Sequence, residues 1–387
     1  MSDTYCPAPW HGGFFMFDRQ SVCCRHDEVP GRSPLKFLSS NHVQDVKQRL
    51  INGNLDSFCQ QCQDGEKTST GNLRQIYMMV AEHNGIKLNR DPAAKSVAEY
   101  AELRLGNLCN FKCRMCGPLA SNSIAAEIEQ HPELEEYYRL SDANRLNSGP
   151  EFLSDVLAMI PTLKKVQFTG GEPTLVPEVI DILDAMVERG YSHDIVINIT
   201  TNTSVINPRI IQRLPHFKTA QISMSLDAVG SVAEYIRYGT KWDRIVENVD
   251  TYIDLAQKHS NIGLHVGTAI TAYSIMEIDQ LIEFISTKPA IRNMLVMSDH
   301  SIFQPNALQG KSRDKAIHSL TSALARLPTL NIMPTDRDSM IQKLTGFKQM
   351  LETQEPDEKL VDKFRRATQD LDRIRNQSFE QVFGIKL

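Results

Sequence analysis

Apolar residues recur with two different periods along the middle of this 387-residue chain. Short runs rich in β-branched residues predict strands at Lys164–Thr169, Asp194–Thr201, Thr219–Leu226, Ile262–Ile270 and Ile291–Met297. Segments with apolar residues on one helical face predict helices from about Pro177, over Trp242–His259 and over Ile275–Ser286. Alternating β and α units of this length favour an α/β fold with parallel strands and right-handed crossovers.

Beyond this alternating region the pattern changes. Residues 311–377 are charged and mostly helical by pattern, including Asp357–Arg375 with charges of both signs on its exposed face. Such a segment is typical of a solvated helical covering. We therefore expect a mostly helical C-terminal region over residues 301–387.

Composition and charge narrow the class of partner. The formal charge is −5 and the pI is near 6.1, which argues against nucleic acid as the main partner. Residues 1–30 lack the apolar core of a signal peptide, and no stretch approaches 18 apolar residues. We therefore expect a cytoplasmic protein with no membrane partner.

All eight cysteines precede residue 117, and three of them, Cys109, Cys113 and Cys116, form a CxxxCxxC pattern. Three thiolates on a four-iron cluster leave one iron open to a small molecule. A structural zinc site would want four ligands. Inert buried thiols are a further alternative, but the Asn, Lys and Arg residues between these cysteines are not typical of a core.

The segment from Leu103 to Cys109, continued by Cys113 and Met115-Cys116, resembles the signature of the radical S-adenosylmethionine (SAM) superfamily. The resemblance implies that SAM chelates the open iron of a [4Fe-4S] cluster. It also implies that an electron cleaves the sulfonium to release a 5′-deoxyadenosyl radical, which abstracts hydrogen from a substrate. A partial (β/α)6 TIM-like barrel over residues 96–300 and a flavodoxin- or ferredoxin-type reductant are implied as well.

A glycine-rich turn follows the strand that ends at Thr169. Its sequence, Gly170-Gly171-Glu172-Pro173, lets the backbone approach a ligand closely and offers a carboxylate to an ammonium group. It resembles the GGE motif, in which the backbone and the glutamate bind the methionine amino group of SAM. An ordinary connection between a strand and a helix is the alternative.

Residues at the ends of two later strands are further candidates for contacts with SAM. Thr201 and Asn202 resemble a threonine–asparagine pair near the bound nucleoside, although they could equally cap the next helix. Ser225 and Asp227, followed by Arg237, resemble a segment that contacts the ribose and the SAM carboxylate, which arginine can hold with two parallel hydrogen bonds.

Two positions depart from the pattern of the family. Ala228 replaces the usual glycine after Asp227. The residue before the third cysteine packs on adenine in this family, and here it is Met115 rather than the commoner aromatic residue. Its polarizable thioether could cover a purine face, or it could simply pack within the loop.

The first 95 residues contain the other five cysteines: Cys6, Cys23, Cys24, Cys59 and Cys62. Their arrangement resembles a twitch or SPASM auxiliary-cluster subdomain, in which a β-hairpin carries two ligands and a later CxxC the others. Here the hairpin would include the alternating segment Phe14–Phe17. The subdomain usually follows the barrel, whereas here it would precede it as residues 1–95.

The resemblance also suggests which cysteines are ligands. Matching Asp18-Arg19 to the Asp-Gly turn of the family favours Cys24 over Cys23, so the expected auxiliary ligands are Cys6, Cys24, Cys59 and Cys62. They would hold a second Fe-S cluster, expected to be [4Fe-4S]. A four-cysteine zinc site is the alternative.

These features predict a radical SAM oxidoreductase that oxidises or cyclises a peptide or a small polar metabolite, with no catalytic residue identified. A redox-neutral epimerase or mutase is the alternative, with the spare Cys23 as a candidate hydrogen donor. A non-catalytic Fe-S or electron-transfer protein would not need Glu172 and Arg237 for a SAM pocket.

Overall fold

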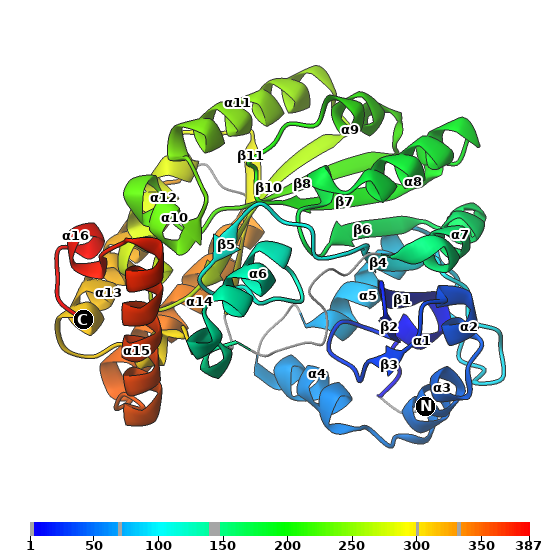
Figure 1. Cartoon of the computed structure of the whole chain (residues 1–387). Coiled ribbons are helices and arrows are strands. Elements are labelled where there is room, and N and C mark those ends of the chain that lie inside the picture. Colours follow the sequence, from blue (N-terminus) through cyan, green and yellow to red (C-terminus); the bar gives the residue numbers. More distant parts are fainter. Residues whose placement is uncertain (1–3, 69–71, 139–147, 299–301, 331–333) are drawn as a thin grey trace. The chain divides into compact units, whose positions relative to one another are not determined.

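The computed structural model describes residues 4–68, 72–138, 148–298, 302–330 and 334–387 (Figure 1). The chain forms two compact units. The first unit comprises Met1–Asn107, Arg145–Ile199 and Pro208–Ala220, and the second comprises Leu108–Asn144, Thr200–Asn207 and Gln221–Leu387. The first unit continues past the expected boundary at residue 95, and the second unit continues past the one at residue 300. The division into three parts therefore stays a prediction.

The sheet of the first unit begins with an N-terminal hairpin. Its strands are β1 (Gly12–Met16), β2 (Arg19–Ser21), β3 (Val29–Pro30), β4 (Tyr100–Arg104), β6 (Lys165–Thr169) and β7 (Val196–Thr201), in the order β3-β2-β1-β4-β6-β7. The pairs β1–β4, β4–β6 and β6–β7 are parallel, whereas β1–β2 and β2–β3 are antiparallel. The hairpin therefore extends the parallel sheet along one edge.

One sequence expectation is wrong in this hairpin. The segment from Phe14 was expected to alternate between buried and exposed positions, but every residue of β1 is buried. β1 lies inside the sheet between β2 and β4, and the helices Ala8–His11 and Pro34–Leu38 contact it.

The helices of the first unit include several with clear start signals. They are α1 (Ala8–His11), α2 (Pro34–Leu38), α3 (Asn41–Asn52), α4 (Ser57–Thr68), α5 (Leu73–His83), α7 (Gly149–Met159), α8 (Pro177–Glu188) and α9 (Pro208–Arg213). Ser40 caps α3, and Asn72 forms a capping box with Gln75 at the start of α5. Helix α8 begins at Pro177 as predicted and buries one apolar face.

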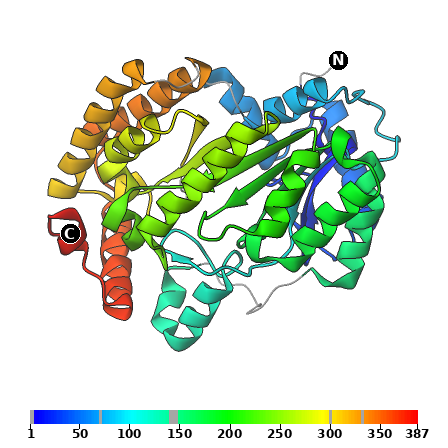
Figure 2. The ribbon, with the colours of Figure 1, turned by 90° about the horizontal axis from the view of Figure 1, so that it is seen from above.

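The second unit contains β8 (Thr219–Ser225), β10 (Ile262–Ile270) and β11 (Ile291–Ser298) in the order β8-β10-β11, with β10 and β11 parallel. A separate small sheet pairs β5 (Lys112–Cys113) with β9 (Arg237–Tyr238). The helices are α6 (Asn122–Gln130), α10 (Gly230–Ile236), α11 (Trp242–Lys258), α12 (Ile278–Ser286), α13 (Gly310–Arg326), α14 (Pro334–Thr353), α15 (Glu358–Arg375) and α16 (Phe379–Phe383). Helix α11 lies along β10 (Figure 2).

The α/β fold class is confirmed: parallel strands alternate with helices, and the C-terminal region is helical. This arrangement is consistent with a partial TIM-like fold. The five predicted strands are present as β6, β7, β8, β10 and β11. Within the described residues, no helix is long and apolar enough to cross a membrane.

Candidate functional site

The CxxxCxxC cysteines lie on one loop of the second unit. Cys113 is buried, whereas Cys109 and Cys116 are partly exposed. Burial raises the pKa of the Cys113 thiol to about 12, the guanidinium of Arg237 lowers it, and the other two thiols raise it further. Cys113 thus lies within electrostatic range of the other two thiols.

The start of α6 holds this loop in place. Ser121 caps α6 and also donates its hydroxyl to the Phe111 carbonyl oxygen, at 2.7 Å. Asn122 accepts the N–H of Cys109 at 2.9 Å, and Ser123 donates to the Cys109 carbonyl oxygen at 2.7 Å. These contacts fix the backbone of the first cysteine.

Cationic side chains flank Cys113 on both sides. The Lys112 ammonium lies 3.0 Å from Glu127, which also pairs with Arg375 of α15 at 2.6 Å. Arg114 is fully buried and pairs with Asp372 of α15 at 2.5 Å. Helix α15 therefore holds the cysteine loop, which corrects the expectation that it only forms a solvated covering.

The predicted residues Asn202, Ser225, Asp227 and Arg237 line one pocket. Arg237 donates through Nε to Asp227 Oδ2 at 2.7 Å, and Asp227 Oδ1 accepts the N–H of Ala269 at 2.8 Å. Although burial opposes the charge, the Asp227 carboxylate and the Cys113 thiol hold the pKa of Arg237 above its usual value. The pocket thus contains a fixed cation at its wall.

Asn202 and Thr201 shape the turn after β7. Asn202 donates to Asn110 Oδ1 at 2.9 Å and accepts the N–H of Ser204 at 2.9 Å. Thr201 Oγ1 accepts the N–H of Thr203 at 3.0 Å. These contacts close a turn instead of capping α9. Met115 is half-buried in the cysteine loop.

The glycine-rich turn belongs to the first unit. Gly170 has φ +110°, and a Cβ there would lie 2.9 Å from the Gly106 carbonyl oxygen. The N–H of Gly171 donates to that same oxygen at 3.1 Å. Glu172 is buried, and its carboxylate accepts the hydroxyl of Thr174 at 2.7 Å. Glycine is thus required at 170 by both backbone conformation and space.

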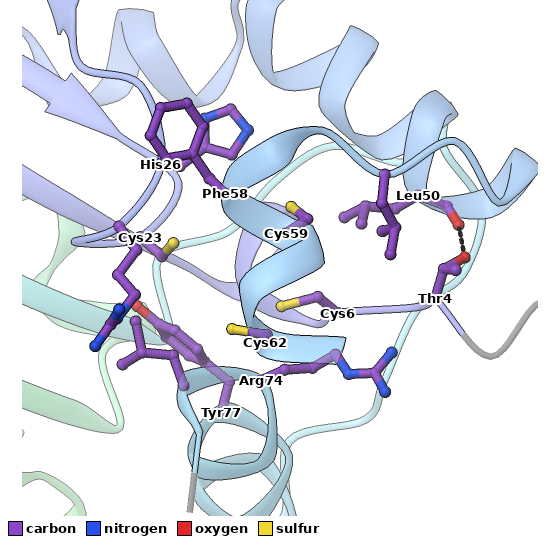
Figure 3. A pocket seen from close by; sticks show the side chains of 13 residues that line it. Thr4, Cys6, Cys23, His26, Leu50, Phe58, Cys59, Cys62, Arg74 and Tyr77 are labelled. Carbon is purple, nitrogen blue, oxygen red and sulfur yellow. Dashed lines mark hydrogen bonds between the residues drawn. The ribbon is translucent and has the colours of Figure 1, made fainter. Parts of the chain in front are cut away.

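Four of the N-terminal cysteines line one pocket of the first unit. They are Cys6, Cys23, Cys59 and Cys62. Figure 3 shows their side chains around the same space. Cys59 and Cys62 lie three residues apart on α4, which places them on one helical face.

Cys24 differs from its expected place. It is exposed and is not among the residues that line this pocket; it lies within electrostatic range of Glu102 and Arg104. Cys23 instead packs against the buried cluster that contains Tyr77 and Tyr100. The geometry therefore favours Cys23 over Cys24 as the fourth member of the cysteine group.

The donor chemistry of this pocket fits a metal centre. Burial raises the pKa of Cys6 to about 12 and that of Cys23 to about 11, so these thiols are neutral at pH 7. Ligation would replace their protons with metal, which makes the affinity dependent on pH. Four thiolates complete the terminal ligation of a [4Fe-4S] cluster or the shell of a zinc ion.

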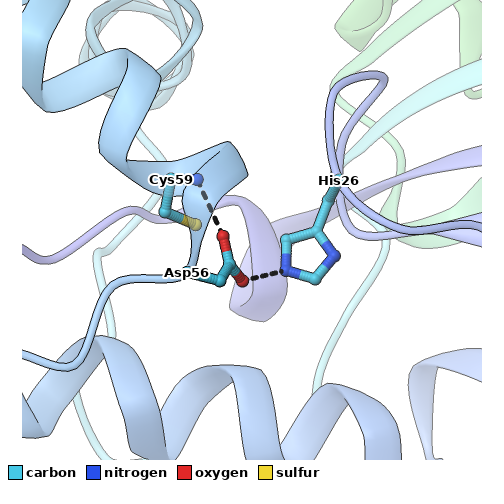
Figure 4. Close-up of side chains that lie close together, drawn as sticks. All are labelled: His26, Asp56 and Cys59. Atoms are coloured by element: carbon cyan, nitrogen blue, oxygen red, sulfur yellow. Dashed lines mark hydrogen bonds and ion pairs between the residues drawn. The ribbon is translucent and has the colours of Figure 1, made fainter.

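A polar group lies beside this pocket. Asp56 accepts the N–H of Cys59 at 2.8 Å and pairs with His26 Nε2 at 2.8 Å (Figure 4). His26, Asp56 and Cys59 are also close enough together to hold a metal ion. The contact to the Cys59 backbone places Asp56 at the start of α4, where a carboxylate stabilises the helix.

The sequence analysis missed a row of polar side chains on β4 and β6. Glu102 is buried and accepts the Thr169 hydroxyl at 3.0 Å, while Arg104 Nε lies 3.3 Å from the same oxygen. Burial raises the pKa of Glu102, against the opposing effect of Arg104. The alternation of Ala101 and Leu103 with these polar residues was the signal that could have found them.

Comparison with known proteins supports the sequence resemblance. Residues 103–285 match the family model of the radical SAM superfamily. The chain is 23% identical to the GTP 3′,8-cyclase of Campylobacter fetus over 256 residues, which cover 65% of this chain and 71% of that protein. It is 22% identical to the molybdenum cofactor biosynthesis protein 1 of Mus musculus over 253 residues, which cover 64% of this chain and only 36% of that protein.

A solved structure is similar to a part of this chain that is about as long as the parts matched by these relatives. The structure of anSMEcpe with bound AdoMet has 14% sequence identity and a TM-score of 0.42, and the match covers 60% of each chain.

Proposed function

Because the chain belongs to the radical SAM superfamily, we propose that it reductively cleaves SAM and abstracts hydrogen from a peptide or a small polar substrate. The observation that carries this proposal is that Cys109, Cys113 and Cys116 lie on one loop, whose first cysteine is held by side chains of α6. When bound there, an open [4Fe-4S] cluster and SAM would supply the 5′-deoxyadenosyl radical. The protein itself would bind and orient SAM and the substrate, and would exclude water from them.

We assign the SAM contacts as follows. Gly170, Gly171 and Glu172 bind the methionine amino group, and Arg237 binds the carboxylate. The ribose contacts Thr201, Asn202, Ser225 and Asp227, and Met115 packs on the adenine. The pocket lined by Asn202, Ser225, Asp227 and Arg237 supports the second group of contacts.

Iron analysis and product analysis test the central assignment. Replacing Cys109, Cys113 and Cys116 together with Ala should remove about half of roughly eight irons per chain. It should also abolish formation of 5′-deoxyadenosine from SAM with a strong reductant. If the triple variant still makes 5′-deoxyadenosine, the cluster lies elsewhere and the proposal fails.

We further propose that residues 1–95 form a twitch- or SPASM-like part with a second cluster held by Cys6, Cys23, Cys59 and Cys62. Their shared pocket supports this set over the one that contains Cys24. A fully ligated cluster cannot bind substrate directly, so its natural use is to accept or relay an electron. This favours oxidation or cyclisation over epimerisation, in which the product radical is quenched by a hydrogen donor.

Two neighbouring cysteines provide a matched test of the second cluster. Cys23→Ala should lower the iron content after native anaerobic purification, whereas Cys24→Ala should leave it unchanged. Both variants should still form 5′-deoxyadenosine. Zinc instead of iron at these cysteines would contradict the redox role and leave a structural site.

A ring closure on a purine nucleotide is a second candidate function. The similarity to a GTP 3′,8-cyclase over 65% of this chain favours it. Incubation with GTP, SAM and a reductant should then consume GTP and stimulate release of 5′-deoxyadenosine. If GTP has no effect on either quantity, a peptide or another polar metabolite remains the proposed substrate.

A further inference from the structure

Two side chains of the second unit donate hydrogen bonds to sulfur atoms of the cysteine loop. Arg237 Nη1 lies 3.8 Å from Cys113 Sγ, and Asn202 Nδ2 lies 3.8 Å from Cys109 Sγ. Both distances are within the range of hydrogen bonds to the larger sulfur atom. Cys113 thus receives a hydrogen bond from a charged side chain, and Cys109 receives one from a neutral side chain.

Both donors are held by other contacts of the second unit. Asp227 binds Arg237 Nε at 2.7 Å and is itself fixed by the N–H of Ala269 at 2.8 Å. The Asn202 amide is held between Asn110 at 2.9 Å and the backbone N–H of Ser204 at 2.9 Å. The amide nitrogen carries two hydrogens, so it can serve Asn110 and the sulfur together.

The surroundings make the charged contact strong. The side chain of Arg237 is 15% exposed and that of Asp227 is 1% exposed, and Cys113 is buried. A positive charge beside a thiolate ligand acts with little screening by water at such a site. Hydrogen bonds to the sulfur ligands and nearby charge are known determinants of the reduction potential of Fe-S clusters.

We propose that Arg237 and Asn202 are positioning residues that raise the reduction potential of the cluster at Cys109, Cys113 and Cys116 through N–H···S hydrogen bonds. Asp227 limits how much of the Arg237 charge acts on the sulfur. The inference rests on the proposed function and adds to it, because it concerns the cluster before SAM binds. A reduced cluster carries one more negative charge than an oxidised one, so a cation and N–H donors favour reduction.

A purely structural ion pair is the competing explanation. In that case the Arg237–Asp227 pair would hold β9 and the strand end of β8 together, and a variant that keeps its cluster would keep its potential. The two explanations differ in sign as well. Removal of Arg237 and removal of the Asp227 charge would both weaken a structural pair, whereas they change the charge beside Cys113 in opposite directions.

The experiment is a potentiometric titration of anaerobic holoprotein without SAM, followed by electron paramagnetic resonance. The signal of this cluster is identified as the one that is lost in the Cys109/Cys113/Cys116→Ala variant. Arg237→Met should lower its midpoint potential, and Asn202→Ala should lower it by a smaller amount. Asp227→Asn should raise it, because the Arg237 charge is then no longer compensated.

Arg244→Met is the matched control, since it removes a cation of the same unit whose side chain is 63% exposed. It should leave the potential unchanged. If Arg237→Met does not fold, Arg237→Lys and Asn202→Ala decide the question, with a lower potential expected in both.

An intact cluster with an unchanged potential in these variants would overturn the inference, as would a shift of the same sign in Asp227→Asn and Arg237→Met. The failure of the proposed function is a separate outcome. In that event the triple cysteine variant would lose no iron signal at all.

Discussion

The buried guanidinium of Arg114 links the cysteine loop to helix α15. Its Nη2 donates to Asp372 at 2.5 Å and to Gln377 at 2.9 Å, and its Nε donates to the Tyr235 carbonyl oxygen at 3.0 Å. Asp372 also accepts the Tyr235 hydroxyl at 2.7 Å and the N–H of Phe379 at 2.7 Å. We therefore expect Asp372→Ala to destabilise the second unit strongly.

The size of the effect follows from the burial. Removing Asp372 leaves the fully buried Arg114 without its carboxylate, which costs about 3–5 kcal/mol. For a unit of roughly 200 residues this lowers the melting temperature by about 6–20 °C. Asp362, on the same helix, has a side chain that is 48% exposed and forms ion pairs with Arg365 and Arg366. Asp362→Ala should cost at most about 1 kcal/mol.

Differential scanning calorimetry of anaerobic holoprotein measures both variants. Iron release to a chelator at a temperature below unfolding provides a second readout, because Arg114 lies between Cys113 and Cys116. Asp372→Ala should lose iron faster than the wild type, and Asp362→Ala should not. Equal melting temperatures for the two variants would refute the claim that α15 holds the loop through this pair.

Three further predictions concern the first unit. Gly170→Ala should lower the melting temperature more than Gly190→Ala, because both have positive φ but only Gly170 has a backbone oxygen within 3 Å of the added Cβ. Glu172→Gln should weaken SAM binding about tenfold or more in calorimetric titration, since a charge-assisted contact contributes about 1.5–3 kcal/mol. Glu188→Gln, at an exposed position, should leave SAM binding unchanged. Burial raises the pKa of Glu102 above 4.5, so the folded state keeps this proton longer than the unfolded state and stability falls as pH rises through that window. Glu102→Gln should remove this loss of stability. The melting temperature of the variant relative to that of the wild type should therefore rise between pH 4 and pH 8.

Local patterns were enough to predict the regular elements. The strand β10 has the bounds that periodicity gave, and the helix α8 begins where it predicted, because alternation and the 3.6-residue repeat depend only on neighbouring residues. The CxxxCxxC spacing was likewise a local signal. The sequence therefore pointed to the cysteine loop and to the turn after β6 without any knowledge of tertiary contacts.

The choice between Cys23 and Cys24 could not be made locally. The two residues are adjacent, and the path of the turn after β2 decides which thiol enters the pocket with Cys6. That path depends on the packing of Cys23 against Tyr77 and Tyr100, which are distant in the sequence. Matching Asp18-Arg19 to the Asp-Gly turn of the family had favoured the neighbouring Cys24 instead.

The role of α15 was missed for a similar reason. Its charges were interpreted as a solvated face, but Arg375 is 1% exposed and pairs with Glu127, which precedes it by 248 positions. A charge pattern along one helix shows which residues are polar and not which of them meet a partner. Only the tertiary structure brings Asp372 and Arg375 to the cysteine loop.

The strand β4 connects the two candidate regions of the first unit. At one end Tyr100 packs against Tyr77 beside the cysteine pocket, with ring centroids 4.9 Å apart. At the other end Arg104 lies 3.4 Å from the position of a Cβ at Gly170. Glu102 lies between them on the same face, since side chains two residues apart share a face of a strand. A shift of one residue in the pairing of β4 would turn Ala101 and Leu103 to this face and remove all three contacts together. The register of this strand with β6, in which Glu102 pairs with Gln167, therefore fixes the cysteine pocket and the glycine turn at once.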